Sequence, residues 1–588
     1  MSDSSQGLRL KVQQWYRERL APTERQRLFG LTILIGGVCG LAAVAFHQSI
    51  KLLAALTIEK AEHASGWKWV PLTVLVPFIG AALAGSLLQS APLARGSGIP
   101  QVKVAYRKRG VVRFRDAVAK FFIGTVQIGT GSSLGREGPT VQICSGVASG
   151  MARLAGLSPQ NVRRLMPVGA AAGIAAAFNA PIAAVTFTIE EIVGTLDQTL
   201  LSGVIVAAAL AAVVERSVLG THPIFEAPAG LSLESPVSLP LYAGLGVAAG
   251  MLSLLFNDLL LGQRKRFREA AGPGWLKPAL GSLSTGALAV VGLWLLGAEG
   301  VTGGGYTTLS RALTGALPVT VMLGLCALKL FATTTTYASG GAGGIFAPTL
   351  FIGGMLGGAF GSLDVQLFDH SSAELGSFAL VGMGALFAGV VRAPITSVLI
   401  IIEMTNGYSL ILPLMIANMS AYAIARRLRP VQIYDALLLQ DGISLDEKPA
   451  DVLEGATVGQ LSLDERPWVT FKLSQSSREL LQAFAEAGRQ EVFPVLDSAD
   501  RLAGIITLED LTTLAASPDL ESLVNAADLM RRPASVLLSE RATVALERMN
   551  SAGVRELPVL DAGQKVIGFV DEAAIARAVL KSRLSPAS

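Results

Sequence analysis

The chain has 588 residues, of which 51% are hydrophobic and only 16% are charged, and its formal net charge is +4. Soluble globular chains carry about 25% charged residues, so this composition excludes a wholly soluble protein, and apolar content this high excludes a disordered one. The 3 cysteines and 4 histidines are scattered without the spacing of a metal site or a disulfide framework. We therefore expect no metal site and no redox enzyme.

The first 28 residues are polar and basic, and they lack the short apolar core and cleavage site of a signal peptide. We predict that residues 1–28 form a cytoplasmic basic N-terminus.

Apolar stretches then recur as far as residue 426, and glycine and proline interrupt several of them. Some are too short to cross about 30 Å of hydrocarbon as one helix. Broken helices at membrane depth are tolerated only where they are buried in protein or line a cavity. We predict a mostly α-helical, multi-pass transport domain over residues 29–443. The stretches lie near 29–57, 70–91, 117–135, 140–156, 165–193, 200–219, 237–261, 277–298, 317–335, 345–367, 376–403 and 409–426.

Basic clusters flank these stretches at residues 9–27, 103–115, 264–268 and 426–429. By the positive-inside rule they lie on the cytoplasmic side. We expect a multi-pass protein of the cell (plasma or inner) membrane with both termini in the cytoplasm. Membrane orientation accounts for the positive charge, so we expect no nucleic-acid partner.

The membrane half repeats itself. Glu137-Gly-Pro-Thr and Phe346-Ala-Pro-Thr open two glycine-spaced apolar segments 209 residues apart. Asn-Ala-Pro-Ile at 179–182 and Arg-Ala-Pro-Ile at 392–395 lie 213 residues apart, and each proline is followed nine residues later by a glutamate, Glu190 or Glu403. Paired, interrupted segments in two halves of a transporter point to a binding site near the middle of the membrane.

Three glycine-rich segments are candidates for holding an anion: Gly-Ser-Gly-Ile-Pro at 96–100, Gly-Arg-Glu-Gly-Pro at 135–139 and Gly-Gly-Ile-Phe-Ala-Pro at 343–348. Proline suits the first turn of a helix, and a helix N-terminus offers free N–H groups and a positive dipole end that bind anions reversibly. Ser97 adds a hydroxyl donor. Taken singly, each segment would instead favour helix packing or a kink.

In this order the three segments resemble the signature of the CLC family of chloride channels and chloride/proton exchangers. The resemblance implies two inverted halves and a homodimer in which each subunit has its own pathway. It also implies that Ser97, the backbone amides of Ile345 and Phe346, and Tyr434 hold the central anion. From its position alone, just beyond the last apolar stretch, Tyr434 would indicate an interfacial aromatic anchor.

Glu137 lies among the amides that are expected to hold an anion. When ionised, its carboxylate can occupy their place as a ligand, and when protonated it is neutral and can move away. Intramembrane carboxylates are costly and usually functional, although a pair with Arg136 is the structural alternative. The resemblance makes Glu137 the gating and external proton-transfer glutamate.

Glu190 and Glu191 end an apolar run, and successive helical residues point about 100° apart, so the two side chains have different surroundings. The resemblance assigns Glu191 as the internal proton-transfer glutamate. An acid there is typical of the exchangers of the family, whereas its channels often have an uncharged residue. The alternative is a solvated pair at a helix end. For Glu403 and Lys120, which also lie in apolar sequence, we expect a satisfied polar network inside the membrane.

Residues 444–588 have the charge content of a soluble domain, and they also repeat. Phe-Pro-Val-Leu-Asp at 493–497 and Leu-Pro-Val-Leu-Asp at 557–561 each precede a glycine that lies ten residues after the proline. We predict a cytoplasmic α/β domain with modules at about 464–518 and 525–583, which resembles a pair of cystathionine-β-synthase-type (CBS) modules.

In such modules a Thr and an Asp often hold an adenosine ribose, which makes Thr507 and Asp510 a candidate adenine-nucleotide site. The second copy departs from this pattern with Asp571 and Ala574. A purely structural dimer tail is the alternative, and no cofactor is expected to be required.

The sequence thus predicts a secondary active transporter that exchanges chloride for protons. A passive, gated chloride channel on the same scaffold is the alternative. A membrane-anchored nucleotide-sensing enzyme or receptor is a weaker one, because residues 444–588 contain no nucleophile–base or metal constellation; we expect no enzyme and no catalytic residue. Chloride is favoured over nitrate because family members that select nitrate tend to carry proline at the position of Ser97.

Overall fold

The structure is a computed structural model that describes residues 24–108, 110–195, 198–220, 231–405, 407–445, 456–461, 467–488, 490–517 and 524–584. The chain divides into two compact units, Met1–Leu445 and Asp446–Ser588. Each unit is described by itself. Most of the predicted basic N-terminus, residues 1–23, lies outside the described residues.

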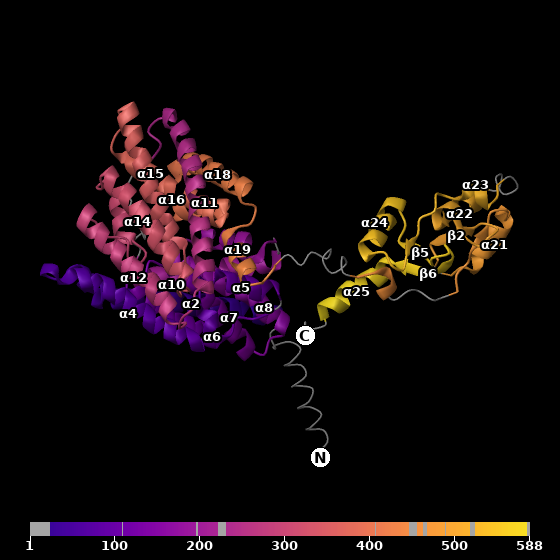
Figure 1. Ribbon diagram of the computed structural model, residues 1–588, viewed down its shortest axis with the longest axis horizontal. Coiled ribbons are helices and arrows are strands. Elements are labelled where there is room, and N and C mark those ends of the chain that lie inside the picture. Colours follow the sequence, from indigo (N-terminus) through magenta and orange to yellow (C-terminus); the bar gives the residue numbers. More distant parts are fainter. Residues whose placement is uncertain are drawn as a thin grey trace, which may run out of the picture. The chain divides into compact units, whose positions relative to one another are not determined.

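The first unit is built of helices in its described part, and they pack into one bundle (Figure 1). In its first half the helices are α2 (Glu24–Leu56), α3 (Ile58–Glu62), η1 (Gly66–Lys68), α4 (Trp69–Ser90), η2 (Pro92–Ala94), α5 (Ile99–Arg107), α6 (Phe114–Gly129), α7 (Glu137–Leu154), α8 (Pro159–Phe178), α9 (Pro181–Phe187), the π-helical η3 (Thr188–Val193) and α10 (Gln198–Leu219).

The second half repeats this order from α13 onward. Its helices are η4 (Pro236–Ser238), α11 (Leu239–Glu269), α12 (Leu276–Val291), the π-helical η5 (Gly292–Leu296), α13 (Tyr306–Leu313), α14 (Val319–Ala338), α15 (Phe346–Phe368), α16 (Ala373–Val391), α17 (Pro394–Thr405), η6 (Tyr408–Leu410), α18 (Ile411–Leu428) and α19 (Ile433–Gln440).

Within the described residues, nine helical segments are long and apolar enough to cross a membrane. Others are too short, because α5, α9 and α13 have only 9, 7 and 8 residues. α5 and α13 each begin directly after a glycine, Gly98 or Gly305, and α9 begins at Pro181. The predicted class, a multi-pass helical membrane protein with broken helices, is confirmed.

The two repeats cap each other's helices. The Glu403 carboxylate, near the end of α17, accepts the N–H groups of Ile182 (3.0 Å) and Ala183 (2.7 Å) in the first turn of α9. The Glu190 carboxylate in η3 accepts the N–H groups of Ile395 (3.3 Å) and Thr396 (2.9 Å) in the first turn of α17. A carboxylate stabilises a helix N-terminus by satisfying its free N–H groups and opposing its dipole. This reciprocal arrangement requires α9 and α17 to run in opposite directions, as in an inverted repeat.

Glycine allows the closest approach between helices. α15 and α16 lie side by side in Figure 1. A Cβ atom on Gly353 of α15 would lie only 2.3 Å from the carbonyl oxygen of Gly382 on α16, and one on Gly382 would lie 2.3 Å from the Gly353 oxygen. No side chain fits at either position, so the close contact between these two helices requires glycine there.

The second unit contains two small mixed sheets of identical topology. Each has strand order 1-2-3, with a parallel first pair and an antiparallel second pair, and each antiparallel pair has a register shift at the same place. Its elements are η7 (Val458–Gln460), β1 (Phe471–Lys472), α21 (Ser477–Glu486), β2 (Val492–Leu496), β3 (Leu502–Thr507), α22 (Leu508–Ala515), α23 (Ala526–Leu529), β4 (Val536–Leu537), α24 (Ala542–Ala552), β5 (Glu556–Leu560), β6 (Val566–Asp571) and α25 (Glu572–Leu584). The predicted α/β pair is confirmed.

Candidate functional site

The three glycine-rich segments meet in the interior of the first unit. Gly135 and Gly344 exchange two backbone hydrogen bonds of 2.7 Å, and the Gly96 N–H donates to the Gly341 oxygen at 2.9 Å. Segments that lie up to about 250 residues apart along the chain thus form one cluster. The cluster is where the sequence predicted an anion site.

Glycine is required for this close packing. A Cβ atom on Gly138 would lie 2.2 Å from the Ser97 hydroxyl oxygen and 2.7 Å from the Ser97 carbonyl oxygen. One on Gly98, whose φ is +99°, would lie 2.8 Å from the Gly138 carbonyl oxygen. Any larger residue at either position would separate the loop that carries Ser97 from the start of α7.

Three helices begin at the cluster: α5 at Ile99, α7 at Glu137 and α15 at Phe346. Ile345 and Phe346 are buried, and neither backbone N–H has a backbone acceptor in the described part of the chain. Free N–H groups at a helix N-terminus, together with the positive end of the dipole, form an anion-binding element without a formal charge. The geometry therefore suits the predicted roles of these two amides.

The hydroxyl groups of Ser97 and Tyr434 are both buried, and within the described residues neither makes a hydrogen bond of ordinary geometry. The Tyr434 phenol lies beside the Ser97 side chain and within electrostatic range of Glu137. The structure thus brings Ser97, Glu137 and Tyr434 together. Because Tyr434 is fully buried in α19, the interfacial-anchor alternative is wrong.

Glu137 is the carboxylate of the cluster and is only 1% exposed. Its Oε1 atom accepts a hydrogen bond from the Tyr306 hydroxyl, and its Oε2 atom is buried without a partner among the described residues. The alternative pair with Arg136 is absent from the described part of the chain; the Arg136 guanidinium lies instead over the Tyr306 ring, 5.2 Å from its centroid. The acid therefore faces the cluster.

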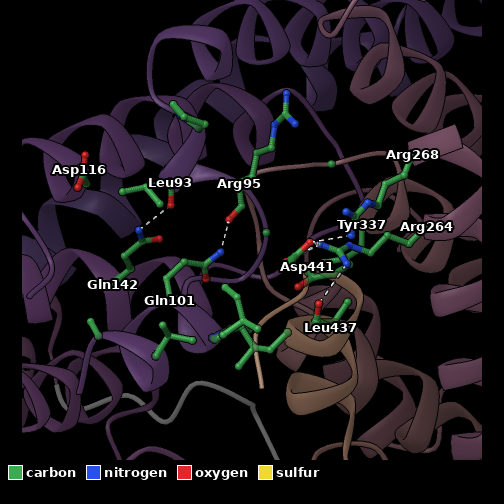
Figure 2. A pocket seen from close by; sticks show the side chains of 18 of the residues that line it. Leu93, Arg95, Gln101, Asp116, Gln142, Arg264, Arg268, Tyr337, Leu437 and Asp441 are labelled. Atoms are coloured by element: carbon green, nitrogen blue, oxygen red, sulfur yellow. Dashed lines mark hydrogen bonds and ion pairs between the residues drawn. The ribbon is translucent and has the colours of Figure 1, made fainter. Parts of the chain in front are cut away.

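Side chains hold the loop that carries Ser97 in place through hydrogen bonds to its carbonyl oxygens (Figure 2). The Gln142 side chain donates to Leu93 O at 2.8 Å and the Gln101 side chain to Arg95 O at 2.9 Å. The buried Lys120 ammonium donates to Ala94 O and Gly96 O at 2.8 and 2.5 Å. These bonds fix the backbone directly before Ser97, and they are the satisfied polar network that was expected for Lys120.

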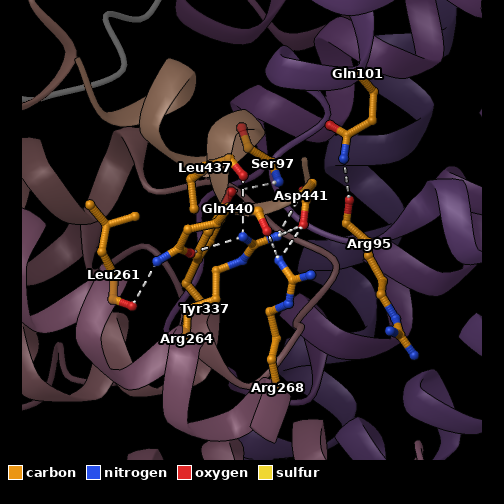
Figure 3. Close-up of polar contacts among 10 residues, drawn as sticks. All are labelled: Arg95, Ser97, Gln101, Leu261, Arg264, Arg268, Tyr337, Leu437, Gln440 and Asp441. Atoms are coloured by element: carbon orange, nitrogen blue, oxygen red, sulfur yellow. Dashed lines mark hydrogen bonds and ion pairs between the residues drawn. The ribbon is translucent and has the colours of Figure 1, made fainter. Parts of the chain in front are cut away.

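The helix that carries Tyr434 is anchored at its C-terminal end (Figure 3). Arg264 of α11 donates to both Asp441 carboxylate oxygens, at 2.8 and 2.9 Å, and Arg268 donates to the same carboxylate at 2.9 Å. Hydrogen bonds between ionised groups such as these are stronger than those between neutral groups. The Tyr337 hydroxyl, which lies beside Arg264 in Figure 3, accepts the Ser97 N–H at 3.4 Å.

Glu191 lies in η3 and is 1% exposed. Its carboxylate accepts from the Lys103 ammonium at 2.8 Å, and the same ammonium pairs with Asp435 at 2.7 Å. Gln432 also donates to Glu191, at 3.4 Å. The alternative of a solvated glutamate pair at a helix end is wrong, because Glu191 is buried in an ion pair and Glu190 caps α17. Lys103, grouped above with a basic cluster, is likewise buried.

Two separate cavities adjoin the cluster and have no lining residue in common. The first, of about 710 Å³, is lined by Gly96, Tyr337 and the two arginines of α11 (Figure 2). The second, of about 540 Å³, is lined by Arg136, Tyr306 and Glu215. Gly96, next to Ser97, lines the first cavity and Arg136, next to Glu137, lines the second, an arrangement that suits a transport pathway.

In the second unit, Thr507 and Asp510 bind each other. The Asp510 carboxylate accepts the Thr507 hydroxyl at 2.7 Å and its N–H at 2.9 Å, which caps α22, and it also accepts Arg531 at 2.6 Å. Burial alone would raise the pKa of the Asp510 carboxyl, but the bonds from Arg531 and Thr507 hold that pKa below its usual range. A neighbouring cavity of about 400 Å³ is lined by Arg531, Arg532 and Arg548.

Sequence reasoning missed Tyr306, Lys329 and the pairing of Lys103 with Glu191. A signal existed for the first two, because Tyr306 lies 209 residues after Ser97 and Lys329 lies 209 residues after Lys120, the spacing of the repeat. Lys329 donates to four carbonyl oxygens, those of residues 300–303, at 2.6 to 3.2 Å. It holds the loop before Tyr306 as Lys120 holds the loop before Ser97.

The comparisons with known proteins cover both units. Residues 79–426 match the family model described as voltage gated chloride channel, and residues 458–517 and 526–581 each match that of the CBS domain. The H(+)/Cl(−) exchange transporter ClcA of Vibrio cholerae serotype O1 (strain M66-2) is 37% identical over 422 residues, which covers 69% of this chain and 88% of that protein.

Solved structures agree with this match. A slow cyanobacterial Cl−/H+ antiporter aligns with a TM-score of 0.65 at 26% identity, over 73% of this chain and 100% of that one. A eukaryotic CLC transporter aligns with a TM-score of 0.63 at 21% identity, over 93% of this chain and 98% of that one; at this identity the likeness concerns the fold alone.

Proposed function

The chain belongs to the CLC family of chloride channels and transporters, and from this premise we propose that it exchanges chloride for protons across a membrane as a secondary active transporter. One observation carries the proposal: a buried carboxylate, Glu137, lies in a cluster of free helix-end amides and hydroxyl groups with two separate cavities adjoining it. Similarity to an H(+)/Cl(−) exchange transporter supports it.

The anion is held by partial charges. Four hydrogen-bond donors can take the place of water around a dehydrated chloride ion. They are the amides of Ile345 and Phe346 and the hydroxyls of Ser97 and Tyr434. A formal cation at this depth would bind chloride too tightly for release, whereas conduction needs binding that is favourable and reversible. Among the described residues these buried hydroxyls have no hydrogen-bond partner of ordinary geometry, which supports the assignment, because buried polar atoms normally find a partner.

Glu137 competes with chloride for these donors. When ionised, its carboxylate is a second anion for the same amides, so it blocks the path. When protonated, it loses its attraction to the helix dipoles and leaves the amides to chloride. Alternation between these two states makes Glu137 both the gate and the external proton-transfer group, and it links anion passage to proton transfer.

Glu191 is the internal proton-transfer group. Its carboxylate is buried within electrostatic range of Tyr434. The Lys103 ammonium favours the ionised form of Glu191, so the ion pair competes with proton uptake there. A channel needs no such acid, which favours the exchanger over the gated chloride channel.

The test is a vesicle assay with pH and chloride electrodes on the reconstituted protein. We expect a chloride gradient to drive protons uphill in the parent. Glu191→Gln should stop proton movement while chloride flux survives, and Glu190→Gln, which alters a helix cap next to it, should keep both. Chloride flux without any proton movement in the parent would establish the channel alternative.

The protein is a multi-pass membrane protein, and we propose further that it works as a homodimer in the cell (plasma or inner) membrane with both termini in the cytoplasm. The family resemblance supports the dimer, and the basic flanks of the spans support the orientation. Cross-linking in intact membranes tests the homodimer. To test the orientation, a cysteine is introduced into the tail and its labelling by an impermeant reagent is compared before and after lysis.

For the tail we propose that an adenine nucleotide binds the first CBS module at Thr507 and Asp510. CBS domains are a family that can bind such nucleotides, and the three arginines of the neighbouring cavity offer charge for phosphate groups. Calorimetry with the full chain and ATP, AMP or adenosine tests the proposal, with Asp510→Ala as the variant and Asp571→Ala as its matched control in the second module. Absence of binding would favour the alternative, in which the tail has a purely structural role in the dimer.

A further inference from the structure

The Tyr306 hydroxyl is the hydrogen-bond donor that the structure gives to Glu137. Tyr306 is the first residue of α13, directly after Gly305, whose φ is +77°. A Cβ atom on Gly305 would lie 2.5 Å from the Phe351 ring, so this loop packs tightly against α15. The position of the phenol is therefore set by backbone packing.

Tyr306 is also the counterpart of Ser97 in the second repeat, at the same offset of 209 residues that relates Lys120 to Lys329. In each repeat a buried lysine binds the carbonyl oxygens of the loop just before the hydroxyl-bearing residue. The fold thus fixes one hydroxyl on each side of the cluster. The first belongs to the proposed anion site, and the second contacts the gating carboxylate.

Tyr306 lies between Glu137 and the 540 Å³ cavity, which it lines together with Arg136 and Glu215. The groups around Glu137 are Tyr306 of α13, Arg136 directly before α7, which lies over the Tyr306 ring, and Tyr434 of α19; Glu215 of α10 lies within electrostatic range of Arg136. Of these, Tyr306 alone donates a hydrogen bond to the carboxylate within the described residues.

We propose that Tyr306 is a positioning residue whose hydroxyl donates to the ionised Glu137 carboxylate while that carboxylate blocks the anion site, and so sets the external acidity at which transport turns on. The inference rests on the gating role proposed for Glu137. A hydrogen bond to a charged acceptor favours the charged form, so removal of the Tyr306 hydroxyl should favour the open form of the gate.

The test measures chloride-driven exchange against external pH for Tyr306→Phe, which removes one oxygen and keeps the ring that Arg136 covers. We expect the pH of half-maximal rate to move up by about one unit, the scale expected from a hydrogen bond to a charged group. Tyr242→Phe is the matched control, because the buried Tyr242 hydroxyl donates to another carboxylate, that of Glu374, at 3.0 Å. It should leave the profile in place.

Glu137→Gln, alone and combined with Tyr306→Phe, separates the two claims. If Glu137→Gln keeps proton-coupled, pH-dependent exchange, the proposed gate is wrong. If Glu137→Gln abolishes the pH dependence but Tyr306→Phe has the parent's profile, the gate stands and the role of Tyr306 is wrong. A Tyr306→Phe effect on the rate that persists unchanged in the Glu137→Gln background would also overturn the inference, because it would act through another group.

Discussion

The two repeats of the membrane unit share a scaffold and differ in chemistry. Where both carry the same residue, that residue supports the backbone: Glu190 and Glu403 cap each other's helices, and Lys120 and Lys329 bind loop carbonyls. These four charged groups lie in apolar surroundings, and each forms hydrogen bonds with main-chain atoms. A buried charge is therefore not by itself a sign of transport chemistry.

Where the repeats differ, the proposed chemistry is found. Glu137 starts α7, but its counterpart Phe346 starts α15 and packs its ring 4.1 Å from that of Phe387, centroid to centroid. Glu191 has Met404 at the corresponding position, 213 residues on. Both proposed proton-transfer acids thus belong to the first repeat. An asymmetric set of acids on a symmetric frame suits a protein that must bind its anion and its proton in different places.

Substitution of a glutamate should have the most different effects in the two repeats. Glu137→Gln should abolish proton coupling, because an amide cannot carry the proton, while anion flux continues; Glu403→Gln should leave the ratio of chloride to protons unchanged. Vesicle fluxes with both electrodes measure this. Loss of coupling in Glu403→Gln, or its retention in Glu137→Gln, would contradict the division into scaffold and chemistry.

The buried lysines should show the next largest effect. Lys329→Met leaves four carbonyl oxygens without a donor and should cost about 3 kcal/mol of stability, and Lys120→Met should have a similar effect. Thermal unfolding in detergent checks this, with Lys265→Met as the control, since that side chain is exposed. Parent-like stability in both buried-lysine variants would show that the loops are held in some other way.

The reciprocal caps should contribute less. Glu190→Gln and Glu403→Gln each weaken one charged cap, which is worth about 1 kcal/mol, and the symmetry of the arrangement predicts similar losses. Thermal unfolding of the two variants and of the double variant measures them. Strongly unequal losses would mean that one of the two glutamates has a further role.

The smallest expected effect on stability lies in the tail. Its two modules can also be compared, because Asp510 in the first module has Ala574 as its counterpart in the second. The pKa of Asp510 in the folded protein is below its ordinary value of 3.8. Its stabilisation of α22, about 0.5 kcal/mol, is therefore complete above that value and is lost as the pH falls through the lowered pKa.

Amide hydrogen exchange of α22 in the full chain tests this. Asp510→Ala should reduce protection at neutral pH and make no difference at pH values below the folded pKa. Glu509→Ala is the control, because Glu509 is exposed and only 3.6 Å from the same arginine. A deficit in Asp510→Ala that is independent of pH would contradict the assignment.

The sequence predicted the broken helices, the three segments and the family, because helix-start prolines, glycines and repeated spacing are local signals. It also placed Glu137 and Ser97 at one site, which the convergence of the segments supports geometrically. The role of each residue stays a prediction. Tyr306 was missed because Gly-Gly-Gly-Tyr at 303–306 carries no helix-start proline and resembles an ordinary loop.

The surroundings of the other charged residues could not be predicted, because burial and pairing are properties of the tertiary structure. Lys103 stands in a run of basic residues from which the positive-inside rule predicts an orientation, yet its own ammonium is buried between Glu191 and Asp435. Asp510 was singled out as a ribose ligand, but its carboxylate is shared between a helix cap and Arg531, which lies 21 residues away in the sequence.

The central claim is that main-chain amides and two hydroxyls, rather than a cationic side chain, hold the transported anion. Anomalous diffraction from crystals of Glu137→Gln grown in bromide tests it most directly. We predict a bromide peak within hydrogen-bond distance of the Ile345 and Phe346 amides and the Ser97 and Tyr434 hydroxyls. Bromide bound only to arginine or lysine side chains, with none at these four donors, would contradict the account.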